Sequence, residues 1–481
     1  MVSLGLLIAL AIIGSSFTLQ SYNFIEKVSL WVRNSFGYFY LYLGLGSVLF
    51  AVGLAFSPWG KIKLGKKEER PAHSFWSWFS MLYSAGMGAG ILLRAVQEPV
   101  FMRENPPIPA HGSNEILALE YTFYQWGFTP WAFYGLFAVV IGYSLFVQKQ
   151  EVRISTSLRG VLKRQMILQG IDIIAILTTV FGLIAAIALG ATQITGGLSY
   201  LGGTDLGLEW TLSLTFIITL LAFISAWRGL NKGIRILSIV NIWLTLLLLV
   251  LVFLFSDMLS VVYFFFIAFG HYLIDLIPMS LAIGNYNPGI VFLTDWTFYY
   301  WAFWLSWAPF TGIFIARISR GRTLAQTLLG VMIIPSIGTF FWFTTFGTSA
   351  FKLMDSATTN LDFSNVFTSI FIFLEQYPLG LILCIMTLIL LVGFLVTSVD
   401  SAVFVLSMFT DKGKKNPQKS HKILWAVVIL ITTSALLVLG DVKADISVLT
   451  AIQKLLIITS LPFSFLLVLL LFGFVINMKK K

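Results

Sequence analysis

The sequence predicts an all-α protein that crosses a membrane many times. Of its 481 residues, 58% are hydrophobic and only 11% are charged, whereas soluble domains carry about 25% charged residues. Stretches without Asp, Glu, Lys or Arg recur along the whole chain, and each approaches or exceeds the ~20 residues that a helix needs to cross a bilayer. This composition excludes a soluble enzyme, a nucleic-acid-binding protein and a disordered chain.

Twelve such stretches are the candidate transmembrane helices. They are 1–25, 34–60, 71–93, 121–148, 173–204, 210–227, 236–256, 296–316, 323–351, 376–399, 423–440 and 455–478. Membrane-spanning strands are excluded, because no stretch shows the alternating pattern of a closed barrel. A cleaved signal peptide is the alternative for the first stretch, but it lacks the basic residues that begin such peptides.

The net charge of +10 is informative about topology. If both termini are cytoplasmic, most of the 31 Lys and Arg residues fall in inside loops, as the positive-inside rule requires. A thirteenth span at 258–274 would move Arg317, Arg320 and Arg322 to the outside. We therefore expect an interfacial or re-entrant helix within 258–290 on the outer side.

Three glycines interrupt the third stretch, at Gly86, Gly88 and Gly90. Glycine weakens a helix locally, and broken helix at membrane depth is tolerated only where it is buried or lines a cavity. Discontinuous helices of this kind mark binding sites in secondary transporters. Close packing of helices through small residues is the alternative, but three glycines in five residues favour a functional break.

Aromatic side chains are concentrated in the fourth and eighth stretches. They are Trp126, Trp131 and Tyr134 in one, and Trp301, Trp304 and Trp307 in the other. The residues alone are compatible with two interpretations, helix packing and an aromatic cage for a quaternary ammonium group, which cannot donate hydrogen bonds and is best bound by ring faces.

Residues 397–401, TSVDS, interrupt an otherwise apolar span. Thr397 and Ser398 carry hydroxyl oxygens suited to a small hard cation such as sodium, although such hydroxyls also bond back to their own helix. Asp400 is either a structural partner or part of a transport pathway. Motifs for metal, nucleotide or nucleophilic catalysis are missing from the sequence, and Cys384 is its single cysteine.

These residues together resemble a known family. The string 296–323, WTFYYWAFWLSWAPFTGIFIARISRGRT, looks like the signature of the betaine/carnitine/choline transporter family. The glycine run with Glu98 and Pro99, segment 126–134 and segment 397–401 resemble its other landmarks in the same order. The resemblance implies a leucine-transporter-type fold with two inverted five-helix repeats. The implied division is 1–74 for two extra N-terminal helices, 75–256 for the first repeat, 257–294 for the interfacial helix and loop, and 295–478 for the second repeat.

The resemblance also implies a function. We expect a secondary transporter that imports a zwitterionic or cationic compatible solute of the betaine, choline or carnitine type by alternating access, as a homotrimer in the cell membrane. Substrate-binding positions would be Trp126, Trp131, Tyr134, Trp304, Trp301, Trp307, Gly88 and Gly90. Sodium is the expected coupling ion, with no other cofactor, and one sodium would be held at Ser84, Met87, Phe394, Thr397 and Ser398.

Arg94 departs from the family pattern, because an aromatic residue and a glycine usually precede the acid Glu98. One interpretation is an intrahelical pair with Glu98 at i+4. The other is that Arg94 faces the outer vestibule and binds an anionic group of the substrate. Two alternative functions stay open: a sodium-independent exchanger or proton-coupled carrier for a more anionic or non-ammonium solute, and, more distantly, a membrane-embedded lipid-modifying enzyme.

Overall fold

The computed structural model of this chain is helical, and the only β-structure in its described residues is an isolated bridge between Lys63 and Thr323. The described residues are 2–86, 88–110, 112–151, 153–228, 231–356, 361–411, 414, 417–441 and 447–479, with only the backbone described at 83–86, 228 and 231–235. Ten helices in this part of the chain are long and apolar enough to cross a membrane. The fold is therefore that of a polytopic membrane protein, as the composition predicts.

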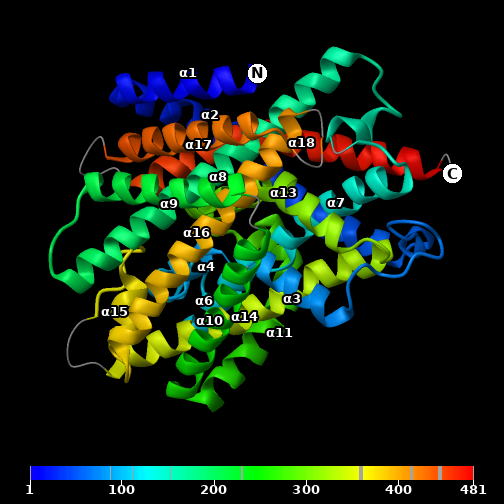
Figure 1. Cartoon of the computed structure of the whole chain (residues 1–481). Helices are drawn as coiled ribbons and strands as arrows, with labels where there is room; N and C mark the ends of the chain where they lie inside the picture. Colours follow the sequence, from blue (N-terminus) through cyan, green and yellow to red (C-terminus); the bar gives the residue numbers. More distant parts are fainter. Residues whose placement is uncertain are drawn as a thin grey trace.

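The first two helices differ from the predicted spans. Helix α1 (Val2–Ser16) is only 15 residues long, and α2 (Thr18–Phe56) is a continuous helix of 39 residues. The chain therefore bends at Phe17, inside the stretch that we expected to be one span. In Figure 1, α1 lies along α17 (Lys419–Gly440), and the two helices are in contact.

Charged residues that were expected to separate those spans lie inside α2. Arg33 pairs with Glu26 at 3.3 Å, and Glu26 also pairs with Lys454 of α18 (Val448–Lys479). Lys454 in turn donates to Tyr22 at 2.7 Å. Because these charges neutralise one another against a neighbouring helix, they do not interrupt α2. A count of uncharged stretches cannot detect this arrangement.

The third and fourth predicted spans are both broken helices. The glycine run separates α3 (Phe75–Gly86) from α4 (Ala89–Arg94), with Gly88 in an extended conformation. Gly127 separates α6 (Asn114–Trp126) from α7 (Phe128–Gly142). A Cβ atom at Gly127 would lie 2.5 Å from the Phe123 carbonyl oxygen and 2.6 Å from the Phe340 ring, so only glycine fits at this break.

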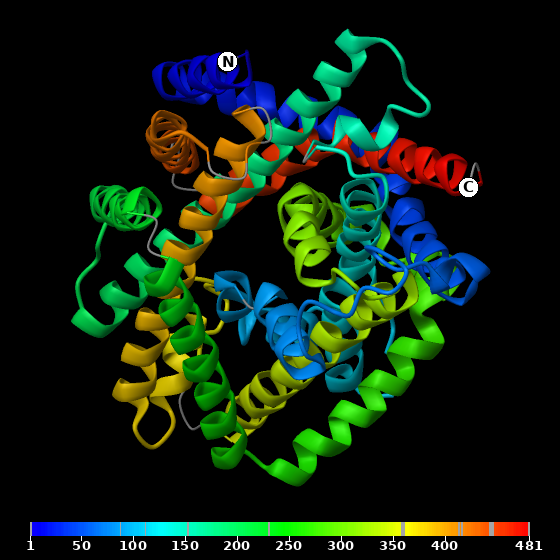
Figure 2. The same ribbon diagram turned by 45° about the vertical axis from the view of Figure 1, so that its right-hand side comes forward.

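The remaining helices complete a bundle around α13. They are α5 (Gln97–Glu104), α8 (Gln165–Gly202), α9 (Leu208–Arg228), α10 (Asn231–Phe255), α11 (Met258–Leu281), α12 (Gly289–Phe292), α13 (Tyr299–Ile318), α14 (Leu324–Ser356), α15 (Ser369–Glu375) and α16 (Gly380–Thr410). A π-helical segment, Leu293–Phe298, leads into α13. Helix α13 occupies the middle of the bundle in Figure 2 and packs on α2, α7, α8 and α18.

Helix α11 covers the segment that we expected to be interfacial. It begins at the N-cap Asp257, whose side chain accepts from the Ser260 amide at 3.2 Å. In Figure 2 it runs obliquely along one side of the bundle, and it packs on α6, α14 and α2. By length and composition it is also one of the ten helices that could cross a membrane.

Candidate functional site

The candidate site is a cavity of about 660 Å³ between the broken α3–α4 segment and helices α8, α10, α13 and α16. Small-molecule sites typically enclose about 300–1,000 Å³, so the cavity has room for a small solute. Aromatic residues of α6, α7 and α13 form part of its wall. Polar residues of α8, α10, α16 and α17 form another part. An apolar surface with a few polar groups is typical of a ligand site.

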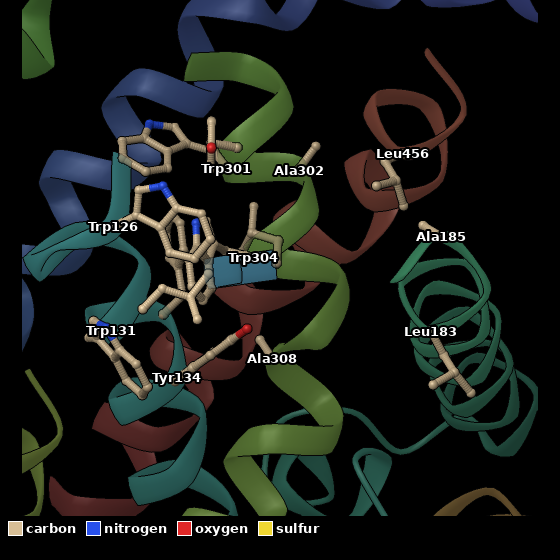
Figure 3. Packing of buried hydrophobic residues seen from close by; sticks show 14 of the residues in the cluster. Trp126, Trp131, Tyr134, Leu183, Ala185, Trp301, Ala302, Trp304, Ala308 and Leu456 are labelled. Carbon is tan, nitrogen blue, oxygen red and sulfur yellow. The ribbon is translucent and has the colours of Figure 1, made fainter. Parts of the chain in front are cut away.

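Three aromatic residues are brought together around a fourth, Trp304. The ring centroid of Trp304 lies 5.4 Å from Trp126, 5.6 Å from Tyr134 and 6.3 Å from Trp131. Figure 3 shows the three residues of α6 and α7 grouped about Trp304 of α13. We call these four residues the aromatic cluster. The break at Gly127 lets Trp126 and Trp131, from two separate helices, approach the same ring.

Two hydrogen bonds fix the indoles of this cluster. Trp304 donates from Nε1 to the Gln125 carbonyl oxygen at 3.1 Å, and Trp126 donates from Nε1 to the Glu98 carboxylate at 3.2 Å. Glu98 is fully buried and also accepts a hydrogen bond from the Tyr300 hydroxyl. The orientation of the Trp126 ring therefore depends on a buried acid of α5, a role that the sequence did not indicate.

The predicted aromatic residues differ in their access to the cavity. Trp126, Tyr134, Trp304 and Trp307 line it. Trp131 packs edge-on against Tyr134 at 5.5 Å and lies behind the wall. Trp301 is fully buried, packs against Tyr124 at 5.1 Å, and lies outside the set of lining residues.

The glycine run forms another part of the cavity wall and lies beside Trp126. Gly88 and Gly90 line the cavity. A Cβ atom built at Gly90 would lie 3.4 Å from the Trp126 ring, so any larger side chain would narrow the space beside the indole. Because glycine has no side chain, a ligand can approach the backbone of this segment closely.

The expected sodium ligands are described only in part. Phe394, Thr397 and Ser398 line the cavity from α16, where the Thr397 hydroxyl donates to the carbonyl oxygens of Gly393 at 2.9 Å and Phe394 at 3.1 Å. Met87 lies outside the described residues, and the Ser84 side chain does too. A hard cation prefers hydroxyl and carbonyl oxygens as ligands. The oxygen atoms of the described residues are therefore of a type that fits sodium.

Arg94 and Glu98 attract each other electrostatically, but they do not form the intrahelical pair that one interpretation expected. Helix α4 ends at Arg94 and α5 begins at Gln97, so Arg94 and Glu98 do not belong to one helix. Arg94 donates to Gln97 Oε1 at 2.6 Å, and its guanidinium carbon lies 4.9 Å from the ring centroid of Trp296. The side chain is buried and lies outside the set of lining residues. A direct role in holding substrate therefore has no support from the geometry.

Polar residues that the sequence analysis missed also line the cavity. Gln193 of α8 and Asn241 of α10 are buried, and all four of their side-chain amide atoms lack hydrogen-bond partners among the described residues. Buried polar groups without partners are uncommon in folded proteins. A single Gln or Asn in an apolar stretch has no sequence signal that separates it from a packing residue, so only the fold could identify this pair.

The fold and the site define a class of protein before any comparison. Many apolar helices, two broken helices and a cavity lined by tryptophans and unpaired amides describe a membrane carrier for a small solute. Residues 1–481 match the family described as betaine/carnitine/choline family transporter, and the chain belongs to this family.

Curated relatives extend over nearly the same length. The glycine betaine transporter of Bacillus subtilis is 38% identical over 456 residues, which cover 93% of this chain and 88% of the relative. The ectoine/hydroxyectoine transporter of Virgibacillus pantothenticus is 32% identical over 481 residues, 98% of this chain and 94% of the relative. The glycine betaine transporter 1 of Vibrio parahaemolyticus is 33% identical over 462 residues, 93% and 87% respectively. The chain is therefore a transporter and not an enzyme.

Proposed function

We propose that this protein imports a zwitterionic quaternary-ammonium solute, with glycine betaine as the first candidate, through the cavity beside the aromatic cluster. The observation that carries the proposal is the grouping of Trp126, Tyr134 and Trp304 on one cavity wall. Ring faces attract a trimethylammonium group through the ring quadrupole, and such contacts contribute about 0.5–2 kcal/mol each.

The ammonium group would bind on the ring faces that line the cavity. Trp126 and Trp304 stand at 90° with centroids 5.4 Å apart, so the two rings are in contact and leave no space between them. Their cavity-facing surfaces instead form a corner, and Tyr134 adds a third ring beside it. A cation seated in this corner lies within reach of more than one ring.

The carboxylate of the solute would be bound by Gln193 and Asn241. Both side-chain amides carry NH₂ donors that lack partners in the described chain, and both line the same cavity as the rings. Donors without partners gain free energy when a carboxylate satisfies them. This arrangement favours a zwitterion over choline, which lacks the acid group.

Sodium coupling is the second part of the proposal. The candidate sodium ligands that line the cavity are Phe394, Thr397 and Ser398. The other two expected ligands are Ser84 and Met87. Leu183 also lines the cavity and offers no oxygen ligand, which supports a single sodium ion per transport cycle. An inward sodium gradient would then drive accumulation of the solute.

The proposed architecture follows from the same reasoning. We propose twelve spans in two inverted five-helix repeats with two extra N-terminal helices, both termini on the cytoplasmic side of the cell membrane, and a homotrimeric assembly. Irregular helix at the start of both proposed repeats supports the pseudo-symmetry: Gly88 interrupts the first, and the π-helical segment Leu293–Phe298 opens the second. The buried placement of Arg94 disfavours the alternative of a more anionic solute.

Uptake into proteoliposomes tests this proposal. Labelled glycine betaine should accumulate when sodium is outside and potassium inside, and accumulation should collapse when sodium is equal on both sides. Equal accumulation without a sodium gradient would contradict sodium coupling and favour an exchanger or a proton-coupled carrier. Absence of any betaine uptake, with transport of another solute, would contradict the substrate assignment.

A further inference from the structure

A second cluster of ionisable side chains lies at the contact between α6 and α11, among residues that the proposed transport site does not use. Glu120 of α6 and His271 and Asp275 of α11 each offer one ligand atom, and these atoms all lie within 4.8 Å of one another. The arrangement joins two helices that are far apart in the sequence. It combines two carboxylates and an imidazole, and several transition metals bind to both of these groups.

The two carboxyl groups of this cluster are buried close together. Glu120 is 4% exposed and Asp275 is 7% exposed. The Tyr286 hydroxyl donates to Asp275 Oδ1 at 2.7 Å, and His271 Nδ1 lies 4.0 Å from Asp275 Oδ2. In the described part of the chain, neither carboxylate forms an ion pair with a lysine or arginine. Two buried acids in contact need a cation or a shared proton between them.

We propose that Glu120, His271 and Asp275 bind one divalent transition-metal ion, for which zinc is the appropriate probe. His, Asp and Glu are each zinc ligands, and three protein ligands with water in the fourth position is the coordination of catalytic zinc sites. Zinc–ligand bonds of about 2.0–2.2 Å would draw the three donors closer than they are without the ion. The His271 side chain is 37% exposed, so the cluster reaches the surface of the protein.

Metal binding at this place would affect the transport site. Tyr272, which follows His271 in α11, accepts a hydrogen bond at its hydroxyl from the Phe128 amide at 2.9 Å. Phe128 begins α7, directly after the Gly127 break between Trp126 and Trp131. An ion that bridges Glu120 to α11 therefore ties α11 to the segment that carries the aromatic cluster. If the transport cycle moves α6 or α7 against α11, bound zinc should slow uptake.

Calorimetric titration of the purified full-length protein, stripped of metal with a chelator, tests the site. We expect one zinc ion per chain, at least tenfold weaker binding after Glu120→Gln and after His271→Ala, and unchanged binding after His421→Ala, which removes a histidine elsewhere. Magnesium should not compete, because it prefers an octahedral set of oxygen ligands. Zinc binding that is unchanged in His271→Ala would overturn the proposal.

A thermal-unfolding series distinguishes the metal from a shared proton. Zinc should raise the midpoint of the wild type and leave that of His271→Ala unchanged, because only a ligand bound to the folded state stabilises it. If zinc has no effect on the wild type and Glu120→Gln raises its midpoint, the carboxyls share a proton and the metal site is refuted. A third experiment, measurement of betaine uptake, rests on the proposed function, whereas the two binding experiments do not. Zinc should slow betaine uptake by the wild type and not by His271→Ala.

Discussion

The indole Nε1 of Trp126 donates a hydrogen bond to the buried carboxylate of Glu98 at a distance of 3.2 Å. This bond joins the short helix α5 to the aromatic cluster. The same carboxylate accepts from the Tyr300 hydroxyl, so one acid connects the segment after the glycine run to α6 and α13. The shape of the proposed ammonium site therefore depends on a residue that lies outside it.

Glu98→Gln should weaken betaine binding about tenfold, which corresponds to about 1.4 kcal/mol. The substituted amide keeps one acceptor oxygen but leaves one of the two donors, Trp126 or Tyr300, without a good partner, and an orphaned buried polar group costs about 1–3 kcal/mol. Calorimetric titration with glycine betaine measures the change. Glu104→Gln is the matched control, because Glu104 lies on the same helix and is exposed. Equal effects of both substitutions would refute the positioning role.

Trp304→Phe should reduce the affinity for betaine roughly five- to thirtyfold, because phenylalanine offers a weaker ring quadrupole and cannot donate to the Gln125 carbonyl. Trp342→Phe is the control, since Trp342 is fully buried in α14 and stacks on Phe346 at 4.5 Å away from the cavity wall. Both variants should be compared by binding and by thermal unfolding. A loss of affinity of similar size in both would mean that the effect is general destabilisation.

Gln193→Met should change stability and binding in opposite directions. It removes buried amide atoms that lack partners, so the ligand-free protein should unfold at a higher temperature. It also removes a proposed carboxylate donor, so betaine should bind several-fold more weakly, while choline binding should stay the same. Thermal unfolding with each ligand measures both effects. A parallel loss for betaine and choline would contradict the assignment of Gln193 to the carboxylate.

Thr397→Val should raise the sodium concentration for half-maximal uptake at least tenfold. The substitution keeps the shape of the side chain and deletes the hydroxyl that faces the carbonyl oxygens of Gly393 and Phe394. Thr387→Val on the same helix is the control, because Thr387 is buried and donates to the Leu383 carbonyl at 2.9 Å. An unchanged sodium dependence in Thr397→Val would exclude this position from the coupling site.

Glu69→Gln should lower the unfolding temperature at pH 7 but not in acid. The backbone amide of Lys66 holds the pKa of Glu69 below its usual range, and Arg320, 2.6 Å away, lowers it further. A depressed carboxyl pKa stabilises the fold above the unfolded-state value, and this contribution is lost as the pH falls through the folded-state value. The difference from wild type should therefore shrink below about pH 4. Glu68→Gln is the control, because Glu68 is the neighbouring residue and is exposed. A difference in unfolding temperature between Glu69→Gln and wild type that does not change with pH would contradict the assignment.

Much of the fold could be predicted from the sequence, because uncharged stretches and helix breakers are local signals. The glycine run predicted the break between α3 and α4. The continuity of α2 through Glu26 and Arg33 was missed, since Glu26 pairs with both Arg33 and Lys454, and Lys454 lies more than 400 positions away in the chain. Ion pairs between distant segments leave no mark in local composition. Gly127 was missed for a similar reason, because part of its need for glycine comes from the Phe340 ring of another helix.

The candidate site could be predicted only at the level of residue type. The spacing of tryptophans indicated which helices carry the rings, but it did not tell which rings line the cavity: Trp304 and Trp307 do, and Trp301 packs on Tyr124 instead. Gln193 and Asn241 could not be identified as binding residues from the sequence. Only the fold shows that these two polar residues of apolar helices line a cavity. For Arg94 the sequence left two interpretations open, and the helix break between Arg94 and Glu98 was not foreseen.

The central claim is that the cavity recognises a positive charge through the aromatic cluster rather than a hydrophobic shape. The most direct test compares glycine betaine with tert-butylacetate, which has the same outline and carboxylate but a neutral carbon in place of the nitrogen. Thermal stabilisation of the purified protein in sodium is the measurement. The account predicts clear stabilisation by glycine betaine and little or none by tert-butylacetate. Equal stabilisation by the two compounds would contradict it.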